Sequence, residues 1–133
     1  MKSESDLNRR IRSVLCATGA MAVSVESGAT QLGIPDIYVR TENTSAWIEL
    51  KHLYYPIHYP FRVPFKPGQY SWLHRHYGLR GTSVLCIETI EHGILFICGP
   101  HIQEVYGSNI LEHCSLHLSR LDGRRIVDWI DSI

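Results

Sequence analysis

Two apolar segments separated by a turn sequence place the strongest constraint on how this chain folds. Residues 36–40 and 46–52 are rich in β-branched and aromatic residues, and Glu42-Asn43-Thr44 lies between them. This pattern predicts two adjacent strands joined as a hairpin. Side chains alternate between the faces of a strand, so Glu49 and Lys51 share one face while isoleucine and leucine occupy the other. The apolar face is predicted to be core, which leaves two opposite charges on the other face.

An acidic residue at the start of the first strand suggests the chemistry of the charged face. Asp36 follows Pro35 directly, and the hairpin would bring it close enough to Glu49 for the two carboxylates to share a cation. Such a pair suits Mg²⁺, which usually takes one or two carboxylates and leaves positions for substrate phosphate. The Lys51 ammonium would lie beside that phosphate, and the backbone carbonyl of Leu50 would complete the ligand set. The combination predicts metal-assisted hydrolysis of phosphodiester bonds.

The rest of the sequence predicts helices and strands in mixed order. Leu7, Ile11 and Leu15 recur at helical spacing after a serine N-cap, which indicates an amphipathic first helix at 4–17. Residues 53–68 hold four of the six prolines and show no helical period, so we expect a long loop there. The other expected elements are a strand at 20–25, a helix at 69–77, strands at 83–88 and 94–98, a short helix at 101–106 and a final helix at 122–133.

These elements predict an α/β fold in which helices flank a central mixed sheet. A chain of 133 residues is large enough for one domain with its own core. We expect the sheet and its first helices within residues 1–98 and a helical extension at 99–133. The last helix carries an apolar stripe that would pack against the sheet or against a second subunit, and it consists of Ile126, Val127, Trp129 and Ile130.

Composition excludes several classes of protein. The chain is 44% hydrophobic and 20% charged, which is ordinary for a soluble globular protein. No apolar run approaches the roughly 20 residues that span a bilayer, and the polar start is no secretory signal. The four cysteines are scattered, and Cys86 and Cys98 lie in apolar runs, as buried thiols do in a reducing compartment. We therefore expect a cytoplasmic protein without disulfides or a membrane partner. The small size of the chain suits a bacterial cell or a virus-infected cell as its source.

The distribution of charge points to a polyanionic partner, although the chain is neutral as a whole. Lysine and arginine total 13, as do aspartate and glutamate, yet no acidic residue occurs between Lys51 and Ile87. A neutral protein with a wholly basic middle can present a positive face to nucleic acid. The residues of this stretch that we assign to nucleic-acid binding are Arg62, Lys66, His74 and Arg75.

The order of these motifs resembles the PD-(D/E)xK nuclease superfamily, and within it the branch of Holliday-junction-resolvase-like and VRR-NUC proteins. The sequence Gly33-Ile34-Pro35-Asp36 matches the first motif of that superfamily, and Glu49-Leu50-Lys51 matches the second. Gln69, at the start of the next helix, matches a helix glutamine, and Glu4 stands where those proteins carry an acid in the first helix. The likeness covers roughly residues 1–98, but the interval between the second motif and Gln69 is longer and more aromatic than usual.

The resemblance implies a restriction-endonuclease-like core and a Mg²⁺- or Mn²⁺-dependent endonuclease, often a homodimer that cuts branched or structured DNA. Asp36 and Glu49 would be direct metal ligands, and Lys51 would stabilise developing charge or orient water. Glu4 would be an accessory ligand acting through water, with Glu26 as the rival acid for that role. Gln69 would position Lys51 or the water.

Two alternatives keep this fold and change the activity. One is a structure-selective DNA-binding or assembly module with little turnover, and the other is a restriction-type nuclease with sequence preference. The aromatic loop also has alternative roles. This loop is the segment 53–68, and its rings would pack on the chain's own core, contact a second subunit or stack on unpaired bases. The rings are those of Tyr54, Tyr55, Tyr59, Phe61 and Phe65.

A zinc site is not expected. His113 and His117 have i, i+4 spacing with Cys114 between them, but no second pair of ligands at metal spacing accompanies them. Trp47 lies on the charged face of its strand, where we expect it to form a wall of the site.

Overall fold

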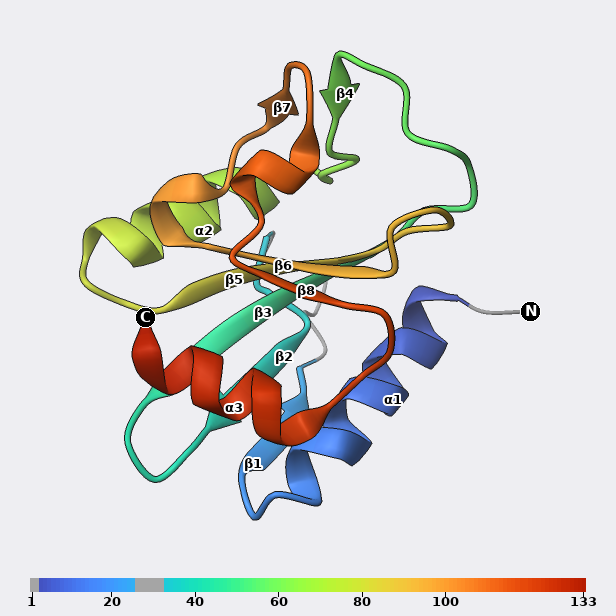
Figure 1. Ribbon diagram of the computed structural model, residues 1–133. Helices are drawn as coiled ribbons and strands as arrows, with labels where there is room; N and C mark the ends of the chain where they lie inside the picture. The colour runs from blue at the N-terminus through green and yellow to red at the C-terminus, as the bar shows by residue number, and fades with distance from the viewer. Residues whose placement is uncertain (1–2, 26–32) are drawn as a thin grey trace.

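A six-stranded mixed sheet organises the chain, and a computed structural model describes it for residues 3–25 and 33–133 (Figure 1). The strand order is β1-β2-β3-β5-β6-β8, in which β3 and β5 pair in parallel and every other pair is antiparallel. The strands of this sheet are β1 (Met21–Ser24), β2 (Ile37–Arg40), β3 (Ser45–His52), β5 (Ser83–Glu88), β6 (Ile94–Cys98) and β8 (Leu116–Leu118). The predicted hairpin of residues 36–52 and the predicted α/β fold are confirmed.

Three α-helices cover the two faces of the sheet, and each forms where sequence periodicity predicts it. Helix α1 (Glu4–Cys16) begins after Ser3, whose side chain accepts a hydrogen bond from the Asp6 amide. Helices α1 and α3 (Gly123–Ser132) lie on one face, while α2 (Gln69–Gly78) lies on the other (Figure 1). None of the described helices is long and apolar enough to cross a membrane.

Burial on both faces of β3 makes this strand the centre of the molecule. Ile48 and Leu50 point into the core beneath α1 and α3, as their alternation predicts. Glu49 and Lys51 point to the other face, where they are also buried, with exposed fractions of 0% and 3%. Two charged side chains buried beside an apolar core need partners or a bound ion, because an isolated buried charge is strongly unfavourable.

The stripe on the last helix belongs to the chain's own core. Ile126, Val127 and Ile130 are buried against α1 and the sheet, and the ring of Trp129 contacts Phe96 of β6 edge to face at 5.8 Å. The prediction that this stripe packs inward is therefore confirmed. Its use as a subunit interface stays a prediction, for which the partly buried Trp129 is the member of the stripe that one chain leaves incompletely covered.

Three elements after β3 differ from the prediction. The expected loop at 53–68 contains the short strand β4 (Phe61–Arg62), which pairs with β7 (Val105–Tyr106). The expected helix at 101–106 is instead a single 3₁₀ turn, η1 (Gly99–His101), followed by β7. A second 3₁₀ turn, η2 (Ile110–His113), precedes β8, so the segment 99–133 is not wholly helical. Strands of two or three residues show no periodicity, and only their distant partners define them.

Candidate metal centre

Asp36 is the residue before β2, and the neighbouring strand β3 holds its side chain in place. Its Oδ2 accepts a hydrogen bond of 2.9 Å from the backbone amide of Leu50. The antiparallel register sets Ile37 opposite Ile48. Asp36, one residue before Ile37, therefore lies beside Glu49, one residue after Ile48. The carboxylate is thus fixed against β3 and keeps its other oxygen for another partner.

Glu49 is a buried carboxylate without a hydrogen bond. Its side chain is fully buried, and neither Oε1 nor Oε2 finds a hydrogen-bond partner among the described residues. The Lys51 ammonium nitrogen lies 3.5 Å from Oε2, which makes an ion pair without close hydrogen-bond geometry. Buried polar atoms in native proteins are nearly always paired, so these two oxygens point to a ligand that accepts lone pairs.

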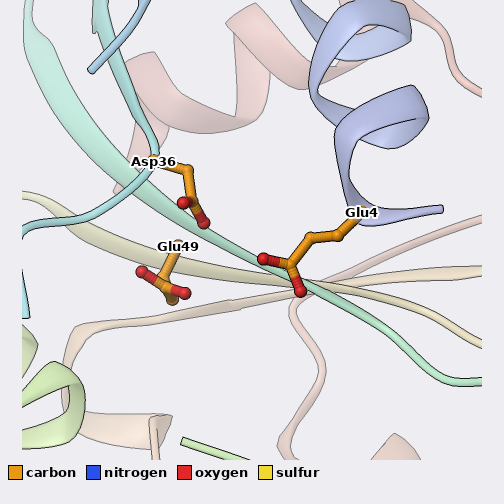
Figure 2. A group of neighbouring side chains, drawn as sticks. All are labelled: Glu4, Asp36 and Glu49. Atoms are coloured by element: carbon orange, nitrogen blue, oxygen red, sulfur yellow. The ribbon is translucent and has the colours of Figure 1, made fainter. Parts of the chain in front are cut away.

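Glu4 completes a cluster of three carboxylates at the first turn of α1. One oxygen each from Glu4, Asp36 and Glu49 lies within 4.8 Å of the other two. Figure 2 shows the three side chains pointing toward one another from α1, from the residue before β2 and from β3. Three carboxylate oxygens at this separation match the ligands that Mg²⁺ and Mn²⁺ prefer.

The electrostatics of the cluster favour a cation. Burial raises the pKa of Glu49 to about 9, the charge of Asp36 adds to the rise, and Lys51 opposes it. Burial likewise raises the pKa of Glu4, and the negative charge of Asp36 raises it further. Without a cation the cluster therefore holds protons, because like charges this close cannot all ionise.

The ammonium of Lys51 is positioned by Gln69. Lys51 Nζ donates a 2.7 Å hydrogen bond to Gln69 Oε1, and the backbone amide of Lys66 donates to the same oxygen at 2.8 Å. Nζ also lies 5.7 Å from the centre of the Phe65 ring. Gln69 thus couples the start of α2 to β3, and the lysine lies beside the acidic cluster with its position restrained.

A solved structure with the same arrangement of elements places this site in a known fold. The chain matches Hjc, a Holliday junction resolvase from the archaeal hyperthermophile Archaeoglobus fulgidus, with a TM-score of 0.62 and 15% sequence identity. The match covers 93% of this chain and 98% of the archaeal chain. The chain has the fold of Hjc. No family model matches the sequence, and no curated protein matches it.

A close backbone approach between two glycines joins the turn before Asp36 to the start of α2. Gly33 has φ +89°, and a Cβ atom added to it would lie 2.3 Å from the carbonyl oxygen of Gly68. Gly68 is the N-cap of α2. The turn that carries Asp36 therefore packs directly on the start of the helix that carries Gln69. The only signal in the sequence was the glycine itself, three residues before the aspartate.

The predicted nucleic-acid residues differ in how near they lie to the carboxylate cluster. Lys66 is close enough for its charge to lower the pKa of Glu4. Arg62 instead makes an exposed ion pair of 3.2 Å with Glu104. His74 and Arg75 are exposed further along α2. The Leu50 carbonyl stays a predicted ligand, and Glu26 lies outside the described residues.

Trp47 packs beside the centre, where its ring contacts Tyr38 at 5.2 Å and Trp72 at 5.5 Å. These contacts make it part of an aromatic wall between β2, β3 and α2. Because Trp47 contacts a ring on each side, it lies in a packed position and does not extend outward toward a base.

A network of partly buried side chains around Glu88 was not predicted. Arg10 of α1 donates two hydrogen bonds to Glu88 of β5, at 2.8 and 2.9 Å. His52 Nδ1 lies 2.7 Å from Glu88 Oε1, so β3, β5 and α1 are joined where the Hjc-like sheet meets the start of the aromatic loop. No local sequence pattern predicts this network, because its members are far apart in the sequence.

Proposed function

We propose that this protein is a divalent-cation-dependent endonuclease that hydrolyses phosphodiester bonds in branched or otherwise structured DNA. The observation that carries the proposal is the convergence of Glu4, Asp36 and Glu49 within 4.8 Å, beside an ammonium held by Gln69. The likeness to a Holliday junction resolvase supports the same class of substrate.

The donor set fits Mg²⁺ or Mn²⁺. All three side chains offer hard oxygen atoms, and no histidine or cysteine joins the cluster among the described residues. The two buried Glu49 oxygens lack hydrogen bonds, which a coordinating cation would remedy. A bound ion would polarise a phosphate oxygen and lower the pKa of a water molecule.

Each residue then has a role that follows from its position. Asp36 and Glu49 hold the cation directly, and Glu4 holds it through water from the first turn of α1. Lys51 stabilises the charge that develops on the phosphate, since its ammonium is fixed next to the cluster. Gln69 keeps that ammonium in place and acts through Lys51 alone.

Cleavage of defined substrates tests the proposal. The purified chain is incubated with a four-way junction, a fork, a nicked duplex and a plain duplex, each with Mg²⁺ or Mn²⁺. We expect at least one structured DNA to be cut, and Asp36→Asn and Glu49→Gln to lower the rate by about 100-fold or more. Asp128→Asn is the matched control, because Asp128 is an exposed acid of α3 that forms an ion pair with Arg124 at 3.6 Å. Equal cleavage by all three variants would assign the activity to a contaminant.

Paired cutting of two strands calls for two copies of the chain, since one centre hydrolyses one strand at a time. We therefore propose that the protein acts on DNA as a homodimer in the cytoplasm of a bacterial or virus-infected cell. Sedimentation of the protein on a junction tests this: a strict monomer that still cuts both strands in one encounter would contradict it.

A further inference from the structure

Two adjacent tyrosines stand out of the aromatic loop that follows β3. Tyr54 and Tyr55 are 59% and 47% exposed, whereas Leu53 before them and Ile57 after them are buried in the core beneath α2. The same loop buries Phe61 against Tyr106, with ring centres 6.4 Å apart. The loop therefore covers its own core with some of its rings and leaves this pair outside.

The chain holds both ends of the segment that carries the pair. The Leu53 amide donates to the Glu88 carbonyl at 3.0 Å, and the Ile57 amide donates to Glu91 Oε1 at 2.6 Å. Pro56 further restricts the backbone of the residue before it. The two rings are thus presented from a short, restrained turn, which lowers the entropy lost when a ligand packs on them.

The ring of Tyr54 packs on the partly buried network of Arg10, Glu88 and His52. It contacts the His52 ring edge to face, with centres 4.6 Å apart. His52 is held in turn by Glu88, which Arg10 binds through both carboxylate oxygens. His52 is also close enough to Glu4 for its charge to lower the pKa of that carboxyl. Tyr54 is therefore one ring contact away from a residue whose charge acts on the Glu4 carboxyl.

The sequence that carries the pair is basic, and the two acids at the ends of this segment are both engaged, since Arg10 pairs with Glu88 and the Ile57 amide donates to Glu91. The segment from Lys51 to Ile87 has no acidic residue, and Lys66 and His58 are exposed cations or potential cations within it. Aromatic rings interleaved with cations bind single-stranded nucleic acid, because rings stack on bases while cations meet phosphates. An aromatic surface without a charge preference would suit a protein partner instead.

We propose that Tyr54 and Tyr55 form a stacking surface for unpaired bases, so that the preferred DNA carries unpaired nucleotides beside the phosphate that is cut. The inference rests on the proposed nuclease function, which places DNA at the carboxylate cluster. It narrows the substrate from branched DNA in general to forks, flaps and gaps, in contrast to a fully paired four-way junction.

Binding without divalent cations tests the inference separately from cleavage. Fluorescence anisotropy in EDTA compares a fork with single-stranded arms and a plain duplex of equal length. We expect the double variant Tyr54→Ala, Tyr55→Ala to lose about tenfold or more in affinity for the fork and to keep its affinity for the duplex. The double variant to Phe retains both rings and should bind both DNAs like the wild type. The matched control is Tyr77→Ala, a tyrosine that is 41% exposed at the opposite end of α2 from Gln69.

A spectroscopic readout reports stacking directly. 2-Aminopurine in the unpaired arm should lose fluorescence when the wild type binds and keep it with the double alanine variant. Equal loss of fork and duplex affinity, or a change from dimer to monomer in sedimentation with unchanged fork preference, would overturn the inference. Fork-selective stacking without any cleavage would refute the nuclease and leave the stacking surface standing. Cleavage with no fork preference in any variant would support the nuclease and refute the stacking surface.

Discussion

Gly33 and Gly68 touch backbone to backbone, so closely that a single Cβ on Gly33 would lie 2.3 Å from the Gly68 carbonyl oxygen. This contact joins the turn before Asp36 to the first residues of α2. The distance between the carboxylates and the Lys51–Gln69 pair therefore depends on a position that carries no side chain. The geometry of the candidate metal centre therefore depends on this packing as well as on the strands that bear the carboxylates.

Alanine at position 33 should damage both stability and activity. Its φ of +89° lies in the left-handed region, where a Cβ costs roughly 1–2 kcal/mol, and the clash with Gly68 adds to that. We expect Gly33→Ala to unfold at a lower urea concentration and to cut more slowly. Gly78→Ala is the control, since a Cβ there meets nothing within 4 Å. Equal midpoints for the two variants would show that the contact is not needed.

Cation affinity should rise with pH. The pKa of Glu49 is raised to about 9 in the metal-free protein, so a cation must displace its proton at neutral pH. We expect the affinity for Mn²⁺, measured by calorimetry, to rise about tenfold per pH unit between about pH 6 and 8. Titrations in two buffers with different ionisation enthalpies should report release of about one proton. Glu49→Gln should bind more weakly and release none, and proton release that persists in this variant would contradict the assignment.

The stability of the metal-free protein should fall as pH rises. The folded pKa of Glu49, about 9, exceeds its ordinary value of 4.5, so the folded state binds the proton more tightly than the unfolded state. The stability that this proton confers is fully present below about pH 4.5 and is lost as pH rises toward 9. The raised pKa of Glu4 acts in the same direction. Urea unfolding across this range should show a slope that Glu49→Gln reduces and saturating Mn²⁺ abolishes, whereas a slope unchanged in the variant would place the proton elsewhere.

Removing Gln69 should slow catalysis without removing the cation. The hydrogen bonds of its side chain go to Lys51 and to the Lys66 amide, and among the described residues none goes to the three carboxylates. We expect Gln69→Ala to lower kcat by about 10- to 100-fold, as loss of an outer-shell partner commonly does. Mn²⁺ affinity measured by calorimetry should change little. Gln103→Ala is the matched control at a glutamine outside the centre, and a large loss of Mn²⁺ affinity in Gln69→Ala would place Gln69 in the ligand set instead.

Lys66 should contribute more to DNA binding than Arg62. Lys66 is exposed beside Glu4, whereas Arg62 is already paired with Glu104. We expect Lys66→Ala to weaken binding of every DNA and to reduce the slope of log affinity against log salt by about one. Arg62→Ala should change the slope less. The Lys66 variant keeps its backbone bond to Gln69, so the centre stays intact. An unchanged slope would exclude a phosphate contact at Lys66.

Local patterns predicted the strands that bear the centre but not the parts that close it. The hairpin with Asp36 and Glu49 follows from alternation and a turn sequence, which act over a few residues. The pairing of β4 with β7 joins residues 61 and 106, and strands of two residues have no period to detect. The Arg10–Glu88–His52 network escaped prediction for the same reason. Each member looks like an ordinary surface charge until the fold brings the three together.

The sequence by itself determined that a charged face, with Glu49 and Lys51 on it, would follow an aspartate at the start of a strand. Strand alternation is local, so no knowledge of distant residues was needed. Only the tertiary structure decided that Glu4 meets this face, because α1 reaches it by burying Leu7, Ile11 and Leu15 on the sheet. It also decided which rings of the aromatic loop stay outside. Burial depends on which distant surfaces are left to cover, and a local pattern carries no record of them.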